Sequence, residues 1–186
     1  MSSSKTILAI VGMPGAGKSV AAEYFSKKSY PVVRFGAVTD EGLKAEGLEI
    51  NPENEKAFRE KLRQELGMAA YAIKVEPLIS AALAKANLVI LDGLYSWEEY
   101  EYLKDKFTEL KLLAVYASPT VRFKRLQQRQ IRPLSEVQAK ARDVAEIANL
   151  NKGGPIAIAD FLVTNNADED SLFKQLELVL TDVAGY

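Results

Sequence analysis

Gly12-Met13-Pro14-Gly15-Ala16-Gly17-Lys18-Ser19 follows directly after the short aliphatic run 7–11 and leads into a stretch with helical spacing. A G-x-x-x-x-G-K-S sequence placed between a strand and a helix is typical of a loop that wraps around a phosphate group. Its glycines let several backbone N–H groups approach the phosphate closely, and the following helix adds the positive end of its dipole. We therefore expect this stretch, together with Val20, to bind the terminal phosphates of a nucleotide such as ATP.

Two side chains of this loop also have a predicted chemical role. The Lys18 ammonium is expected to bridge the β- and γ-phosphates, and the Ser19 hydroxyl is expected to ligate Mg²⁺. The competing interpretation is a glycine-rich turn that binds nothing. The position of the loop at the first strand–helix junction favours phosphate binding.

Strand-like and helix-like segments alternate along all 186 residues. The five aliphatic runs that predict strands are apolar on both faces, as parallel strands between two helical layers are. They lie at Ile7–Val11, Pro31–Phe35, Leu88–Leu91, Leu110–Tyr116 and Phe161–Thr164. We predict one α/β domain over residues 1–186, with three layers around a doubly wound, parallel five-stranded sheet. A helical insertion is expected at about 38–86 and a short lid at about 125–155.

Local signals predict several helix boundaries. The sequence Asn-Pro-Glu at 51–53 offers a cap, a first-turn proline and an acid matched to the helix dipole, and that helix should stop at Gly67. Ser96 and Ser135 each begin a sequence with capping-box spacing. The last helix should begin near Asp168.

The composition excludes several classes of site. The chain has no cysteine, which excludes disulfides, thiolate nucleophiles, zinc ribbons and iron–sulfur clusters. It has no histidine, which excludes the Ser-His-Asp triad and imidazole bases. With a net charge of −1, no overall field attracts nucleic acid or an anionic membrane, so any anion site must be local. Because no apolar run reaches membrane-spanning length and the first residues lack a secretory signal, we expect a cytoplasmic protein with no nucleic-acid or membrane partner.

A carboxylate follows the third predicted strand. Four apolar residues at 88–91 are followed by Asp92-Gly93, at the sheet edge where ligands bind in open α/β sheets. Asp92 is expected to hold Mg²⁺ through water or to accept a proton from the incoming nucleophile. Alternatively, Asp92 caps a turn, because Asp-Gly is a common turn pair.

Four of the eight arginines fall within eleven residues, at Arg122, Arg125, Arg129 and Arg132. The first three have the spacing of one helix face. Such a cluster is repulsive unless anions meet it, and planar guanidinium groups suit phosphate oxygens. We expect the arginines at 125, 129 and 132 to stabilise charge on a transferring phosphoryl group. The alternatives are a solvated helix face that pairs with Asp or Glu elsewhere and, with less support, a nucleic-acid patch.

The phosphate-binding loop, the Asp-Gly strand end, the arginine segment and the tail 159–165 together resemble one branch of the P-loop kinases, the nucleoside monophosphate and dephospho-CoA kinases. Within that branch the chain is similar to a poorly characterised prokaryotic family often labelled dephospho-CoA-kinase-like or adenylate-kinase-related. The resemblance implies a P-loop kinase fold, ATP and Mg²⁺ as cofactors, and lid arginines. It also implies that Asn165 and Asn166 lie near the nucleotide base and that the acceptor site follows the second strand, at 34–41.

At the expected acceptor site, the chain departs from both patterns of that branch. Nucleoside monophosphate kinases usually carry Asp-Gly-Phe-Pro-Arg, but here the sequence after Asp-Gly is Leu-Tyr-Ser. Dephospho-CoA kinases usually carry Asp-x-Asp after the second strand, and residues 36–40 offer at most one aspartate. The candidates for acceptor binding are Arg34, Asp40, Arg59, Arg63 and Tyr95. Arg59 and Arg63 alternatively pair with glutamates of their own helix, and Tyr95 either stacks on a base or packs.

These features predict Mg²⁺- and ATP-dependent phosphoryl transfer to a small-molecule acceptor, with a nucleoside monophosphate as first choice and dephospho-CoA as second. Asp40 or Asp92 is the candidate base. A nucleotide-binding switch or regulatory ATPase is the alternative from another class, although no Asn/Thr-Lys-x-Asp guanine signature is present. Residues 125–155 are expected to close over the phosphates, with Gly153-Gly154-Pro155 as a hinge or merely a turn.

Overall fold

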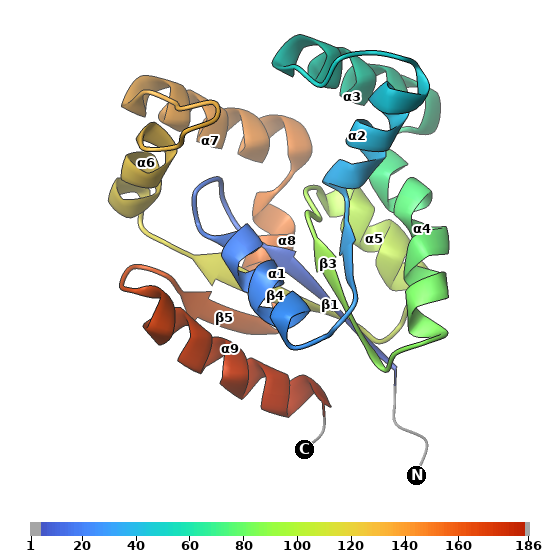
Figure 1. Cartoon of the computed structure of the whole chain (residues 1–186), viewed down its shortest axis with the longest axis vertical. Helices are drawn as coiled ribbons and strands as arrows, with labels where there is room; N and C mark the ends of the chain where they lie inside the picture. Colours follow the sequence, from blue (N-terminus) through green and yellow to red (C-terminus); the bar gives the residue numbers. More distant parts are fainter. Residues whose placement is uncertain (1–4, 185–186) are drawn as a thin grey trace.

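The computed structural model describes residues 5–184 and contains a five-stranded parallel sheet (Figure 1). Its strands are β1 (Thr6–Val11), β2 (Val32–Arg34), β3 (Leu88–Asp92), β4 (Leu110–Tyr116) and β5 (Phe161–Thr164). Their order in the sheet is β2-β3-β1-β4-β5. The connection after β1 leads towards one edge of the sheet and the connection after β4 leads towards the other. The doubly wound α/β class predicted from the sequence is therefore confirmed.

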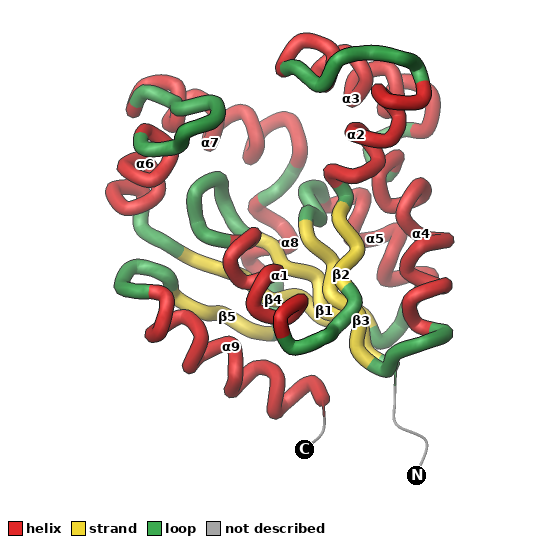
Figure 2. The backbone as a smooth tube through the Cα atoms, viewed as in Figure 1, coloured by secondary structure: helices red, strands yellow, loops and turns green. Residues whose placement is uncertain are grey.

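The central strands of this sheet are buried on both faces, as the apolar runs predict, whereas Leu162 of the edge strand β5 is 66% exposed. Along β1, Ile7, Ala9 and Val11 join the core on one face, whereas Leu8 and Ile10 join the core on the other. The helices α4 (Ala70–Leu83) and α5 (Trp97–Lys106) cover the first face. The helices α1 (Lys18–Lys27) and α9 (Glu169–Ala184) cover the second (Figure 2). Because β1 is buried on both sides, it fixes the start of the loop that follows it.

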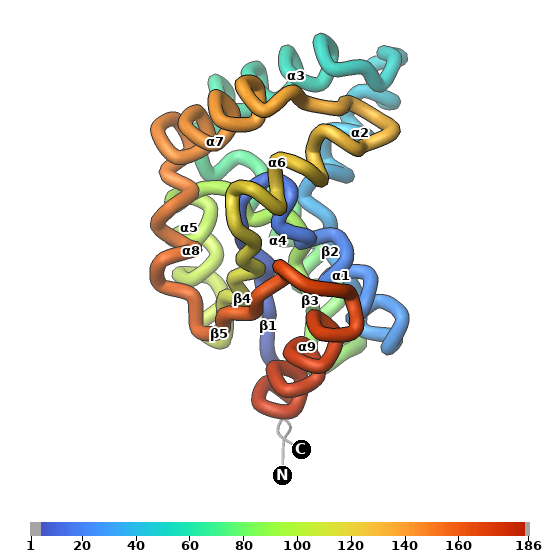
Figure 3. The backbone as a smooth tube through the Cα atoms, turned by 90° about the vertical axis from the view of Figure 1, so that its left-hand side faces the viewer, coloured from blue at the N-terminus to red at the C-terminus, as the bar shows by residue number. Residues whose placement is uncertain are grey.

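Two groups of helices rise beyond the carboxyl ends of the strands, on opposite sides of the loop after β1 (Figures 1 and 3). The first group follows β2 and consists of α2 (Gly36–Ala45) and α3 (Pro52–Leu66). The second follows β4 and consists of α6 (Pro119–Gln127) and α7 (Glu136–Leu150), after which α8 (Gly153–Ala157) returns to the sheet and packs against β4 and α5. These helices occupy the ranges expected for the insertion and the lid. Their closing motion stays a prediction.

The predicted helix boundaries at these groups are confirmed. The side chain of Asn51 caps α3 by accepting a hydrogen bond from the backbone N–H of Asn54 at 2.9 Å, and the helix ends just before Gly67. Ser96 and Ser135 each form both reciprocal hydrogen bonds of a capping box, at the start of α5 and α7. Local sequence therefore decides where these helices begin.

One sequence-based expectation for the lid region is wrong. Helix α6 ends at Gln127, so Arg129 lies in the loop that follows and does not share a helix face with Arg122, whereas Arg132 lies beyond the helix as expected. The chain turns back there, and the backbone N–H of Leu134 donates to the carbonyl of Leu126 at 3.1 Å. Residues 153–155 form the start of α8, which excludes the alternative of a mere turn, and their role as a hinge stays a prediction.

The length and apolar character of the helices decide whether any of them could span a membrane. Among residues 5–184, no single helix is long and apolar enough to cross a membrane. The adjacent helices α3 and α4 reach the required length and apolar character only when they are taken together, and they are bent by 86° relative to each other.

Candidate functional site

The loop between β1 and α1 has a conformation that only glycine tolerates at two of its positions. Gly15 has a φ of +79°, and a Cβ atom there would lie 2.8 Å from the carbonyl oxygen of Arg122. Gly12 has a φ of +146°, and a Cβ atom there would lie 2.4 Å from the carbonyl oxygen of Val115. The loop therefore packs tightly against β4 and α6, and a side chain at either position would force it away from them.

Lys18, the first residue of α1, folds back over this loop. Its Nζ donates hydrogen bonds to the carbonyl oxygens of Gly12, at 2.8 Å, and Met13, at 3.3 Å. Burial and, after it, the positive charge of Lys152 lower the pKa of Lys18 to about 7. The protonated form is thus disfavoured in this protein environment and would gain from a bound anion.

A cavity of about 210 Å³ opens in front of the loop. It brings together Lys18, Ser19 and Asp92, the three side chains predicted to handle phosphate and metal. Its other lining residues are Pro14, Gly15, Arg34, Gly36, Tyr95, Arg129, Arg142, Glu146 and Lys152. Basic side chains outnumber carboxylates in the lining of this cavity, as a phosphate site requires.

Asp92 ends β3 at the position where that strand faces both neighbours, opposite Ile10 of β1 and Arg34 of β2. Burial raises the pKa of its carboxyl, and the charges of Lys18 and Arg34 oppose that shift. Within the described residues, no group of three or more His, Cys, Asp or Glu side chains forms a metal site made of protein alone. Mg²⁺ is usually held by one or two protein oxygens together with phosphates and water, so Ser19 and Asp92 fit this ion.

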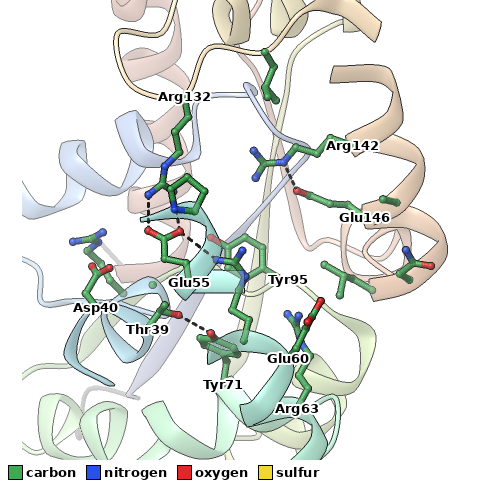
Figure 4. Close-up of a pocket in the computed structure, with 18 residues that line it drawn as sticks. Thr39, Asp40, Glu55, Glu60, Arg63, Tyr71, Tyr95, Arg132, Arg142 and Glu146 are labelled. Carbon is green, nitrogen blue, oxygen red and sulfur yellow. Dashed lines mark hydrogen bonds and ion pairs between the residues drawn. The ribbon is translucent and has the colours of Figure 1, made fainter. Parts of the chain in front are cut away.

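A second cavity, of about 990 Å³, lies between α2, α3 and α7 (Figure 4). All five candidates for acceptor binding line it, namely Arg34, Asp40, Arg59, Arg63 and Tyr95. It shares Arg34, Gly36, Tyr95, Arg142 and Glu146 with the smaller cavity. The two cavities therefore adjoin at the carboxyl ends of β2 and β3.

Glu55 of α3 neutralises two of the arginines in the larger cavity (Figure 4). One of its carboxylate oxygens accepts a hydrogen bond from Arg59 at 3.3 Å. Arg132 donates to both carboxylate oxygens, at 2.8 and 2.5 Å, from the loop on the opposite side. These contacts confirm the ion-pairing interpretation for Arg59, and they also engage Arg132.

Arg63 and Arg34 differ from Arg59 and Arg132 in how their charges are paired. Arg63 lies over the ring of Tyr71, with its guanidinium carbon 5.7 Å from the ring centroid, and its Nε is buried without a hydrogen-bond partner. Among residues 5–184, neither Arg63 nor Arg34 forms an ion pair. The larger cavity therefore keeps two positive charges that no carboxylate neutralises directly.

The three predicted lid arginines reach three different places. Arg129 lines the small cavity in front of the loop. Arg132 lines the larger cavity, where Glu55 holds it. Arg125 points towards the tail after β5 and donates to Asn165 at 3.3 Å. They do not form a single cluster, because α6 ends before two of them.

The two asparagines expected near the nucleotide base both form contacts with neighbouring backbone. The amide nitrogen of Asn165 donates to the carbonyl of Ala16 at 2.8 Å, so this buried side chain buttresses the phosphate-binding loop. The side-chain oxygen of Asn166 accepts from the backbone N–H of Ser118 at 2.7 Å. Both residues thus lie where the tail meets the loop and α6.

Arg122, the first arginine of the segment, contacts both the phosphate-binding loop and α7. Its guanidinium donates to the carbonyl of Pro14 at 3.0 Å and to both carboxylate oxygens of Asp143, at 2.9 and 2.6 Å. It is 5% exposed, so this is a buried ion pair. Arg122 therefore connects the phosphate-binding loop to α7.

Sequence reasoning missed a second charged group, on α7 and α8. Glu146 accepts hydrogen bonds from Arg142, at 2.9 Å, and from Lys152. The ammonium of Lys152 also lies 4.8 Å from the ring centroid of Tyr95, whose pKa burial raises to about 12. The i, i+4 spacing of Arg142 and Glu146 is visible in the sequence. The inward direction of Lys152 is not, because it depends on the left-handed turn at Asn151, with a φ of +50°.

Comparison with known sequences gives consistent matches along the chain. A sequence profile described as an AAA domain matches residues 8–149. UPF0200 protein MJ1399 of Methanocaldococcus jannaschii is 37% identical over 180 residues, which are 95% of this chain and 90% of that protein. UPF0200 protein PF1294 of Pyrococcus furiosus is 35% identical over 179 residues, which are 94% of this chain and 96% of that protein.

Comparison with solved structures gives the same fold. TT1252 from Thermus thermophilus has a TM-score of 0.64 and 22% identity, and the match covers 96% of this chain and 98% of that one. A gluconokinase from Sinorhizobium meliloti 1021 has a TM-score of 0.60 and 14% identity, with 98% and 95% covered. A shikimate kinase from Acinetobacter baumannii in complex with shikimate has a TM-score of 0.57 and 11% identity, with 98% and 95% covered. At these identities the likeness shows the fold.

Proposed function

The chain belongs to the family described as an AAA domain and to the UPF0200 proteins, and we propose that it is an ATP- and Mg²⁺-dependent small-molecule kinase. Its fold is that of P-loop kinases. The loop after β1 supplies the glycines, the lysine and the serine with which proteins of this fold hold a nucleoside triphosphate and its metal.

One observation carries the proposal. The cavity in front of the phosphate-binding loop adjoins the larger, arginine-rich cavity, and Arg34 and Tyr95 line both. A kinase must hold a donor and an acceptor so that they meet at the transferred group, whereas a nucleotide switch needs one site. A volume of about 990 Å³ also lies in the range of small-molecule sites.

The proposed reaction uses charge stabilisation more than covalent chemistry. The bond between the γ-phosphorus and the oxygen that bridges to the β-phosphate breaks, and a bond forms between this phosphorus and an acceptor oxygen. Lys18 and Arg129 would share the charge on the transferring group. Mg²⁺, for which Ser19 and Asp92 are the proposed ligands, neutralises phosphate charge when bound.

The fate of the acceptor's proton depends on the acceptor. A hydroxyl acceptor would give its proton to Asp92 or Asp40, and burial raises the pKa of Asp92, which makes this carboxylate a stronger base than an exposed one. A monophosphate oxygen needs no base, because it is already ionised near neutral pH.

For the acceptor, a nucleoside monophosphate is the first class to test and dephospho-CoA the second. Arg34 and Arg63 offer guanidinium groups without carboxylate partners, and such groups bind phosphate oxygens well. Tyr95 offers a ring on which a base would stack. The names of the fold relatives, gluconokinase and shikimate kinase, add carboxylate-bearing polyhydroxyl compounds as a third class.

A coupled assay of ADP release tests the proposal. The purified protein is incubated with ATP, Mg²⁺ and a panel made of the four common nucleoside monophosphates, dephospho-CoA, gluconate and shikimate. The expected result is ADP release that one acceptor class accelerates at least about tenfold, with formation of the phosphorylated product. ATP hydrolysis that no acceptor accelerates would count against the kinase and favour a switch or regulatory ATPase.

A further inference from the structure

Lys152 carries a buried ammonium group that the roles above leave unused. Only 1% of the residue is exposed, although its side chain lines the cavity in front of the phosphate-binding loop. Its Nζ pairs with the carboxylate of Glu146 and lies 4.8 Å from the ring centroid of Tyr95. Burying an ammonium is costly unless an anion balances it, so its surroundings indicate what it binds.

Glu146 alone does not balance the cations around it. The same carboxylate also accepts a hydrogen bond from Arg142 at 2.9 Å, so two positive charges share one negative charge. The cavity as a whole is lined by five basic side chains and two carboxylates, so basic groups outnumber acidic ones by three. The cations are Lys18, Arg34, Arg129, Arg142 and Lys152, and the carboxylates are Asp92 and Glu146. Like charges this close are best tolerated when an anion binds between them.

The position of Lys152 indicates which phosphate it would meet. Lys18 belongs to the helix that follows the loop. In the proposed complex the loop's N–H groups would surround the inner phosphates. Lys152 instead precedes α8 and is held by Glu146 and Tyr95, two residues that line both cavities. The phosphate nearest to the acceptor cavity is the γ-phosphate, because it is the group transferred.

Building on the proposed function, we infer that Lys152 is a further catalytic residue, whose ammonium contacts the γ-phosphoryl oxygens while Glu146 and Tyr95 position it. Lys152 acts in its protonated form; burial lowers the pKa of this ammonium, and its pairing with Glu146 opposes that shift. It forms no covalent bond, and it stabilises the charge on the phosphoryl group as that group passes from the oxygen of ADP to the acceptor oxygen.

The competing role is purely structural, in which the Lys152–Glu146 pair ties the start of α8 to α7. Lys152→Met separates the two roles. In this variant Glu146 keeps its hydrogen bond to Arg142, so no buried carboxylate is left without a partner and the fold should persist. A structural role would affect the binding of every nucleotide to a similar degree, whereas contact with the γ-phosphate would affect only triphosphates.

Isothermal titration with Mg²⁺-ADP and with a Mg²⁺-bound, non-hydrolysable ATP analogue makes this comparison. Lys152→Met should weaken binding of the analogue by about 10- to 100-fold and leave ADP affinity unchanged. Lys152→Arg should recover part of the loss, because it keeps the charge. Lys140→Met is the matched control, since Lys140 is an exposed lysine of α7 that pairs with Glu136. In the kinase assay, kcat should fall in Lys152→Met with little change in the acceptor KM.

An equal loss of affinity for both nucleotides, or no loss for either, would overturn the inference. If the wild-type protein binds neither nucleotide, the proposed function itself fails. If the wild-type protein binds both and Lys152→Met behaves like Lys140→Met, only the role of Lys152 fails. Should Lys152→Met not fold, the same pair of titrations on Lys152→Gln and Lys152→Arg decides the question, with melting curves as the check on folding.

Discussion

At the scale of single residues, this protein holds buried cations with few carboxylate partners. Lys18 bonds to two backbone carbonyls, Arg63 has a buried Nε without a partner, and Lys152 shares one glutamate with Arg142. Each such group costs folding free energy, and a domain has only about 5–15 kcal/mol in total. The arrangement is consistent with a site that gains stability when anions bind.

Lys18→Ala should separate function from folding. Because burial lowers the pKa of Lys18 to about 7, its charged form is disfavoured in the folded protein, and removing the ammonium should not destabilise the fold. The turnover of the proposed reaction should fall by about 100-fold or more, since one charge contact to the transferring group is lost. Melting temperature and the ADP-release assay measure the two effects. A variant that unfolds would instead identify Lys18 as a structural lysine.

Residue contacts could be predicted from the sequence where they are local. The glycines of the loop and the i, i+4 pair of Glu55 with Arg59 depend on neighbours within a few positions. The pair of Arg132 with Glu55 joins residues 77 positions apart, and no spacing in the sequence indicates it. The inward direction of Lys152 was missed because it depends on the left-handed turn at Asn151, which no spacing in the sequence indicates.

At the scale of secondary structure elements, the start of α5 contains a second perturbed carboxyl. Glu99 completes the capping box and accepts hydrogen bonds from the backbone N–H groups of Tyr95, at 2.7 Å, and Ser96, at 3.3 Å. Burial raises the pKa of Glu99 from 4.5 to about 7 although both hydrogen bonds oppose the shift. Its other carboxylate oxygen is buried without a partner.

This shift predicts a loss of stability as the pH rises. Because the folded pKa lies above the unfolded one, the contribution of Glu99 is fully present below pH 4.5 and is lost as the pH rises through 7. The difference between the folded and unfolded pKa corresponds to a loss of roughly 3 kcal/mol in the free energy of unfolding. Urea unfolding at pH 5 and pH 8 should show that, between the two pH values, the free energy of unfolding changes by roughly 3 kcal/mol less favourably in the wild-type protein than in Glu99→Gln, whose amide oxygen still accepts both N–H groups. The comparison of the two proteins is needed because Lys18, whose pKa is lowered to about 7, acts in the opposite direction in both. Glu101→Gln, on the exposed side of α5, is the control and should behave like the wild type.

Elements could be predicted wherever the pattern is strong. The strands Leu110–Tyr116 and Phe161–Thr164 have the bounds expected from their apolar runs, and the caps at Ser96 and Ser135 are as expected. The end of α6 could not be predicted, because the arginine spacing would allow the helix to continue. In the structure the chain turns back after Gln127, and the backbone N–H of Leu134 donates to the carbonyl of Leu126.

At the scale of the whole molecule, two arginines connect the parts that surround the cavities. Arg122 joins the carbonyl of Pro14 in the phosphate-binding loop to Asp143 of α7. Arg132 joins the loop before α7 to Glu55 of α3, on the other side of the larger cavity. A ligand that favours one position of α7 would therefore also favour particular positions of the phosphate-binding loop and of α3.

Ligand binding should order residues 125–155. Water must be kept from the transferring phosphoryl group, so this segment is expected to close over bound substrates. Hydrogen exchange measured by mass spectrometry should show slower exchange across 125–155 with a bisubstrate analogue than without ligand, and little change in β1. Equal protection in both states would show that these helices do not act as a lid.

The contact between Arg132 and Glu55 provides a sharper test of the same motion. Glu55→Gln keeps the shape of the side chain but removes the charge that holds Arg132 across the larger cavity. Without ligand, exchange in residues 128–135 should increase about two- to fivefold, a modest effect because the side chain of Arg132 is 48% exposed. Glu60→Gln, in the same cavity but without contact to Arg132, is the control. Unchanged exchange in Glu55→Gln would mean that packing around α7, rather than this ion pair, holds the two helical groups together.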